Sequence, residues 1–78
     1  NQVAIYPNPA SSSLFISTGE QSAIIIEIVD VFGKKILYQK VYDGQAVDVS
    51  ALNSGTYILK SFNADNGQQS GQTRFIKD

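Results

Sequence analysis

The stretch AIIIEIVDVFGKKILY, residues 23–38, contains an apolar run, a turn and the start of a second apolar run. In an extended strand, successive side chains point to opposite faces of the sheet. The even-numbered isoleucines of residues 24–28 therefore share one face, and the odd-numbered positions of residues 25–29 share the other. Both faces are mostly apolar, with Glu27 as the exception, which predicts a central strand of a sheet.

The turn in this stretch has the residue types that a hairpin requires. Asp30 can accept hydrogen bonds from backbone N–H groups two or three residues further on, and Gly33 can adopt a positive φ angle. The pattern predicts a hairpin between strands at Ala23–Val31 and Lys34–Tyr42.

The rest of the chain repeats this alternation of short apolar runs and turn residues. Runs of β-branched and aromatic residues are separated by Gly, Asn, Asp, Ser and Pro at roughly 8–12-residue intervals, and no segment has a helical period. This spacing predicts an all-β, immunoglobulin-like antiparallel β-sandwich of about seven strands, forming one domain over residues 1–78. The expected strands are Val3–Tyr6, Ser13–Ser17, Ala23–Val31, Lys34–Tyr42, Ala46–Val49, Thr56–Asn63 and Gln72–Lys77.

Three other connections have recognisable turn chemistry. In Tyr6-Pro7-Asn8-Pro9, each residue before a proline is forced into extended geometry, so the chain is expected to turn there. Asp43-Gly44 and Asn66-Gly67 are typical of tight hairpins. The segment Leu52–Tyr57 resembles the corner of a sandwich, where the Tyr57 hydroxyl is expected to bond a backbone group upstream.

Composition excludes several classes of function. The 78 residues hold no Cys and no His, which removes disulfides, the usual zinc sites and His-based proton transfer. The net charge of −1 without a basic stripe argues against nucleic acid, and no apolar run reaches the ~20 residues of a membrane helix. Because the sequence opens at Asn1 without a leader, we expect a piece of a longer secreted protein.

No constellation for catalysis or metal binding is visible. A serine nucleophile usually needs a His as its general base, and the sequence has no His to activate Ser11-Ser12-Ser13 or Ser50. Asp43, Asp48 and Asp65 are scattered rather than arranged in a calcium-binding loop. We therefore expect no enzyme activity, no cofactor, no metal and no small-molecule substrate.

Four blocks, in order along the chain, carry a resemblance to a known family. They are Tyr6-Pro7-Asn8-Pro9 with Leu14 and Ile16; Asp30, Gly33 and Lys34; Asp48, Ser50, Leu52, Gly55 and Tyr57; and Arg74-Phe75-Ile76-Lys77. Singly each block is common, but together they span most of the chain. Their order and spacing resemble the type A C-terminal sorting domain of proteins exported by the type IX (Por) secretion system.

The resemblance implies a function as an export address. In that family the domain is read in the periplasm of a Gram-negative bacterium, and the labelled protein crosses the outer membrane to the cell surface or medium. The partners implied are the outer-membrane translocon and a sortase-like peptidase. The peptidase cuts the chain upstream of the sandwich and so removes the sorting domain. Within the motifs, the residues expected to have structural roles are Asn8, Pro9, Asp48, Gly55 and Tyr57.

Two segments are candidates for recognition by the translocon. One is the turn with Asp30, Gly33 and Lys34, although turn formation alone also explains these residues. The other is the final strand Thr73–Lys77, which includes Arg74, Phe75 and Ile76 and is expected at a sheet edge. A receptor could extend such an edge by adding a strand, with side chains such as Arg74 and Lys77 selecting the partner.

Two other functions stay open at this point. The chain could be an accessory carbohydrate-binding module of a secreted protein, in which case Tyr6, Tyr38 or Tyr42 should form an exposed platform. It could also be a structural or adhesive spacer, recognised by nothing.

Overall fold

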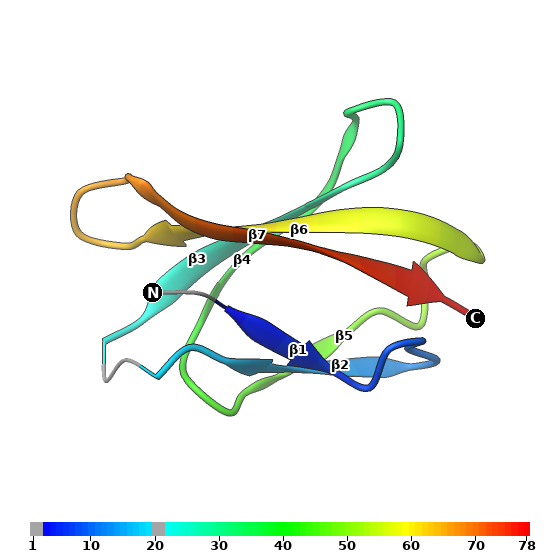
Figure 1. Ribbon diagram of the computed structural model, residues 1–78, viewed down its shortest axis with the longest axis horizontal. Helices are drawn as coiled ribbons and strands as arrows, with labels where there is room; N and C mark the ends of the chain where they lie inside the picture. The colour runs from blue at the N-terminus through cyan, green and yellow to red at the C-terminus, as the bar shows by residue number, and fades with distance from the viewer. Residues whose placement is uncertain (1–2, 20–21) are drawn as a thin grey trace.

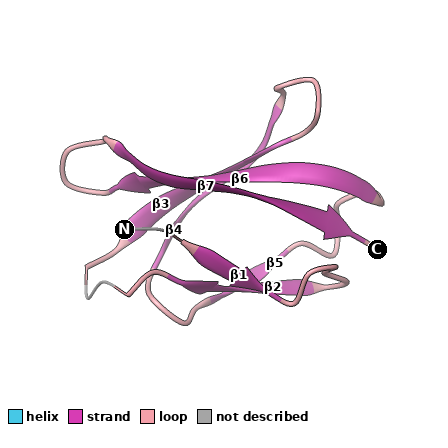
Figure 2. Cartoon of the chain, viewed as in Figure 1, coloured by secondary structure: helices cyan, strands magenta, loops and turns pink. Residues whose placement is uncertain are grey.

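The computed structural model describes residues 3–19 and 22–78 as two antiparallel sheets packed face to face (Figure 1). Within these residues the secondary structure is entirely β, as Figure 2 shows by colour. The strands are β1 (Ala4–Tyr6), β2 (Ser13–Ser17), β3 (Ile24–Val29), β4 (Lys35–Val41), β5 (Ala46–Asp48), β6 (Gly55–Asn63) and β7 (Gln69–Lys77). The all-β sandwich expected from the sequence is confirmed. Of the single domain expected over residues 1–78, positions 1, 2, 20 and 21 lie outside the described residues.

The strand order places the isoleucine-rich strand in the middle of the larger sheet. One sheet has the order β1-β2-β5, and the other has the order β4-β3-β6-β7. β3 therefore has a neighbour on each side, as predicted from the apolar character of both its faces. β7 lies at the edge, as expected for the final strand.

The core lies between the inner faces of the two sheets. Ile26 and Ile28 of β3 are fully buried, as are Leu14 and Ile16 of β2 in the opposite layer. Leu59 of β6 is also fully buried. Because alternate residues of each strand point inward, the two sheets interlock through their apolar side chains while the intervening side chains point outward.

The corner before β6 has the predicted tyrosine bond. The Tyr57 hydroxyl donates to the backbone carbonyl oxygen of Asn53 at 2.7 Å, and the Tyr57 ring stacks on Phe75 of β7 with centroids 5.7 Å apart. This arrangement is the tyrosine corner of immunoglobulin-like sandwiches, and it attaches the β5–β6 crossover to the core.

One predicted hairpin is a crossover between sheets instead. The backbone N–H of Gln45 donates to the Tyr42 carbonyl at 3.0 Å, so the chain does turn at Asp43-Gly44. However, β4 and β5 belong to different sheets. A turn sequence specifies a local reversal but not the sheet that the next strand joins. Asn66-Gly67, in contrast, lies in the hairpin between the paired strands β6 and β7, as predicted.

The segment of residues 7–10, here called the proline strap, connects the smaller sheet to the edge of the larger one. The Ala10 N–H donates to the Ile76 carbonyl, and the Asp78 N–H donates to the Ala10 carbonyl, each at 2.8 Å. The Asn8 side-chain oxygen accepts a third bond, from the Ile76 N–H at 3.0 Å. The proline strap therefore closes the terminal part of the β7 edge.

The last strand is longer than the sequence indicated. It begins at Gln69 rather than Gln72, and its first residues pair with the end of β6. These residues are Gln, Ser and Gly, which have no apolar alternation. Backbone pairing with β6 places them in the strand, a contribution that side-chain patterns do not reveal.

Candidate recognition surface

The β3–β4 turn is held by hydrogen bonds that converge on Asp30. Its carboxylate oxygen accepts from the backbone N–H groups of Phe32 and Lys34, both at 2.9 Å. Its own N–H donates to the Lys34 carbonyl, and its carbonyl accepts from the Gly33 N–H, both at 3.0 Å. Gly33 has a φ of +84°, which costs an L side chain roughly 1–2 kcal/mol. Asp30 and Gly33 thus fix the shape of the turn.

The tip of this turn is apolar and exposed. Phe32 is 91% exposed and Val31 is 64% exposed. The hairpin extends beyond the rest of the sandwich, at the upper right of Figure 1. Sequence reasoning did not select these two residues as functional. The available signal was two large apolar side chains in the middle of a tight turn, where burial in the core is not possible.

The final strand presents only part of its recognition motif. Arg74 is exposed and Ile76 is 48% exposed, whereas Phe75 is fully buried and Lys77 is 7% exposed. The expectation that Arg74 and Lys77 would together face a partner is therefore wrong. The two residues are three positions apart, and an odd spacing places side chains on opposite faces of a strand.

Both recognition segments lie at the same end of the larger sheet. Val29, the last residue of β3, pairs with Ile58 of β6, and Ile58 pairs with Arg74 of β7. The turn that follows β3 therefore projects from the end of the sheet at which β7 terminates. β4 and β7 are separated by three strand spacings, or about 14 Å.

The outer edge of β7 divides into a covered part and an open part. The proline strap bonds to the backbone of Ile76 on this edge. Arg74 lies two residues earlier, so its backbone N–H and carbonyl groups point the same way. Within the part of the chain that the structure describes, no strand pairs with β7 on this side at Arg74.

The residues expected to be structural lie in the proline strap, at strand ends and at the corner before β6. The set is Asn8, Pro9, Asp48, Gly55 and Tyr57. Asn8 and Pro9 belong to the proline strap, and Gly55 is the first residue of β6. Asp48 ends β5, and its carboxylate accepts from the Ser50 hydroxyl at 2.6 Å and from the Ser50 N–H at 2.9 Å. These two bonds lower the pKa of Asp48 below its ordinary value of 3.8.

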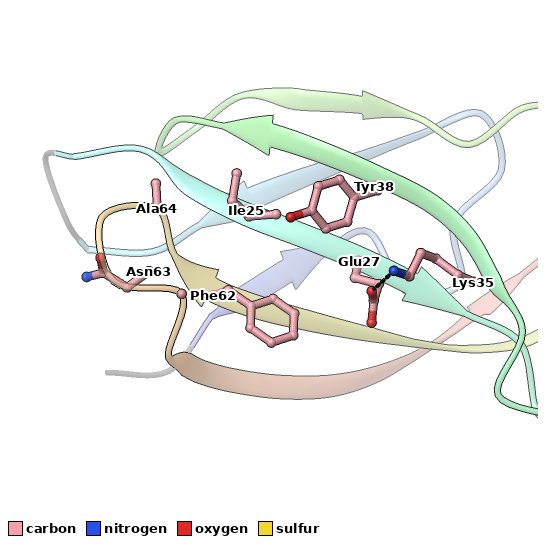
Figure 3. A pocket seen from close by; sticks show the side chains of 8 residues that line it. Ile25, Glu27, Lys35, Tyr38, Phe62, Asn63 and Ala64 are labelled. Carbon is pink, nitrogen blue, oxygen red and sulfur yellow. Dashed lines mark ion pairs between the residues drawn. The ribbon is translucent and has the colours of Figure 1, made fainter.

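A pocket of about 370 Å³ lies on the outward side of the larger sheet (Figure 3). Tyr38, Ile25 and Phe62 supply apolar walls from three adjacent strands. Beside them Lys35 forms an ion pair with Glu27 at 3.1 Å. Sequence reasoning did not identify this pocket, because its residues come together only through the pairing of β4, β3 and β6.

Other kinds of site receive less support. Among the described residues, no three acidic side chains lie close enough to hold a metal ion. Tyr6 is on the smaller sheet, stacked on Phe15, while Tyr38 is on the larger sheet. The tyrosines therefore do not form one flat platform for a carbohydrate. In residues 3–19 and 22–78 there is also no helix with the length and hydrophobicity needed to cross a bilayer.

The fold and its exposed surfaces define a class of protein: a small immunoglobulin-like module with projecting loops and a partly open strand edge. A family model described as the secretion system C-terminal sorting domain matches residues 4–78. The chain therefore belongs to this family, the sorting domains of type IX (Por) secretion. In the same comparisons, no curated protein and no solved structure matches the chain.

The general function of the chain follows from its family membership. It is a type IX secretion sorting signal, and it acts by interaction with that secretion system. The protein that carries it is secreted or displayed at the cell surface. Sorting domains of this family are not generally catalytic, and a role as a carbohydrate-binding or spacer module is not favoured.

Proposed function

We propose that the outer-membrane translocon recognises this domain in folded form, in the periplasm, through the end of the larger sheet. The observation that carries the proposal is the meeting of two features at that end. One is the turn fixed by Asp30 and Gly33, and the other is the outward-facing Arg74 near the terminus of β7.

The two features have complementary roles in this proposal. The β3–β4 turn presents Lys34 on a backbone whose shape is set by the Asp30 carboxylate. The open part of the β7 edge offers the backbone of Arg74 to an added strand, while the exposed side chains of Arg74 and Ile76 give specificity. Phe75 and Lys77 act by holding β7 in the sandwich, since both are buried.

The proposal includes processing after export. A sortase-like peptidase cuts upstream of the sandwich and joins the cargo to the cell surface or releases it. The sandwich itself serves as the label, and the parent protein reaches the periplasm by a separate N-terminal signal.

Substitution of the two exposed cations tests the recognition surface. The variant Lys34→Gln/Arg74→Gln removes two positive charges at this end of the sheet. The matched control, Ala4→Glu/Ala46→Glu, changes the net charge equally on the exposed face of the smaller sheet. We expect reduced export of the first variant alone, with both unfolding midpoints near that of the unsubstituted domain. Equal export of both variants would reject the proposed surface.

A further inference from the structure

The outward face of the larger sheet is apolar at its centre, although among residues 3–19 and 22–78 no second layer of the sandwich covers it. The smaller sheet packs on the opposite face. Ile25 lies directly across from Phe62, and Val29 lies directly across from Ile58, on the two central strands. Ile25, Ile58 and Phe62 are only partly buried. An apolar stripe on the solvent side of a sheet is typical of a contact surface.

Positive charge surrounds this stripe. The cations are Lys35 and Lys40 on β4, Lys60 on β6 and Arg74 on β7; with the stripe they are here called the basic face. In β3, β4, β6 and β7 the only carboxylate is that of Glu27, which pairs with Lys35 at 3.1 Å.

The charges of the chain are therefore segregated. Four cations and one carboxylate give the basic face three net positive charges, while the rest of the sequence holds two lysines and six carboxylates. The positive charge of the basic face and the negative charge of the rest of the chain nearly cancel, so the net charge is only −1. A surface of one sign attracts a partner of the other sign and orients it during approach.

The pocket adds a shape requirement to the charge requirement. It opens on the basic face between Tyr38 and Phe62, with Ala64 and Gly67 of the β6–β7 loop at its margin (Figure 3). Its volume of about 370 Å³ accommodates one large apolar side chain. Such a side chain would contact the Phe62 and Tyr38 rings, and buried aromatic contacts of this kind supply much of the affinity at protein interfaces.

We propose that the basic face is a docking surface for an acidic protein segment in which carboxylates flank one protruding apolar side chain. The carboxylates pair with Lys40, Lys60 and Arg74, and the apolar side chain enters the pocket beside Phe62. A bilayer surface satisfies the cations but has no protruding group to fill the pocket. This interaction is additional to the sorting function, and its test does not depend on export.

The first experiment is a titration of the isotopically labelled 78-residue chain with the capped peptide Glu-Leu-Glu-Phe-Glu-Leu-Glu, followed by NMR. A peptide with Gln in place of every Glu is the control. We expect amide shifts around Ile25, Tyr38 and Phe62, and an affinity about tenfold higher for the acidic peptide. Binding should weaken between about 0.1 M and about 1 M NaCl, since the Debye length falls from about 10 Å to about 3 Å. Equal binding of both peptides, or shifts confined to the β3–β4 turn, would overturn the proposal.

The second experiment removes charge from the face itself. The variant Lys40→Gln/Lys60→Gln should bind the acidic peptide about fivefold more weakly, because two cations of the contact are lost. The control Ala4→Glu/Ala46→Glu has the same net charge and should bind within about twofold of the unsubstituted chain. Equal losses in both variants would show that net charge alone governs binding and would reject the site.

Two other occupants of the face are distinguishable. Binding to vesicles that contain phosphatidylglycerol, without binding to the acidic peptide, would assign the face to a lipid surface. Self-association in sedimentation, lost in Lys40→Gln/Lys60→Gln, would assign it to a second copy of the chain. Either result would contradict the proposed acidic partner.

Discussion

Phe75 and Ile76 are neighbours in the final motif, yet the structure predicts very different consequences when each is truncated to alanine. Phe75 is fully buried in the core, with 0% solvent exposure, and its ring stacks on Tyr57. Phe75→Ala should cost about 3–5 kcal/mol of unfolding free energy. A domain of this size without disulfides holds only about 3–5 kcal/mol in total, so this variant should be largely unfolded. Ile76 is 48% exposed, and Ile76→Ala should cost about 1 kcal/mol.

Urea titration followed by circular dichroism measures both values. We expect no folded baseline for Phe75→Ala and a modest shift of the midpoint for Ile76→Ala. An export defect of Phe75→Ala would then report the loss of the fold, whereas a defect of Ile76→Ala would report the loss of an exposed contact. A Phe75→Ala protein within about 1 kcal/mol of the unsubstituted domain would refute the assignment of this residue to the core.

Three further predictions concern single hydrogen bonds. Tyr57→Phe removes the corner bond to the exposed residue Asn53 and should cost about 0.5–1.5 kcal/mol in urea titration, and an unchanged midpoint would contradict the tyrosine corner. Asn8→Ala should speed hydrogen exchange at the Ile76 amide, and unchanged protection there would show that the proline strap holds without this side chain. Ser50→Ala removes the hydroxyl bond and keeps the backbone bond, so it should raise the pKa of Asp48 toward 3.8 in an NMR titration, and no movement would reject the Ser50 hydroxyl as the main cause. Because the folded pKa is lowered, this bond contributes stability above pH 3.8 that is lost as pH falls through the folded value, so both proteins should converge in acid.

The sequence was most informative where local chemistry determines the structure. The central position of β3 followed from the apolar character of both faces, and the role of Asp30 and Gly33 followed from the geometry of a tight turn. The Tyr57 bond followed from the pattern of a sandwich corner. In each case a few adjacent residues contain the cause.

The sequence was least informative where distant segments meet. The bond from the Ile76 N–H to the Asn8 side chain joins residues 68 positions apart, and no local pattern predicts it. The pocket beside Phe62 likewise depends on the register of three strands. The inward orientation of Lys77 could have been deduced from its odd spacing to Arg74, but the motif suggested a common surface.

The central claim is that this folded sandwich directs export by the type IX system, and a transport assay tests it most directly. Residues 1–78 are fused through a flexible linker to a fluorescent protein that is active in the periplasm. The fusion is expressed in a strain with a working type IX translocon and in a strain without one. We predict fluorescence at the surface or in the medium only in the competent strain; retention in the periplasm of both strains, with the domain folded, would contradict the account.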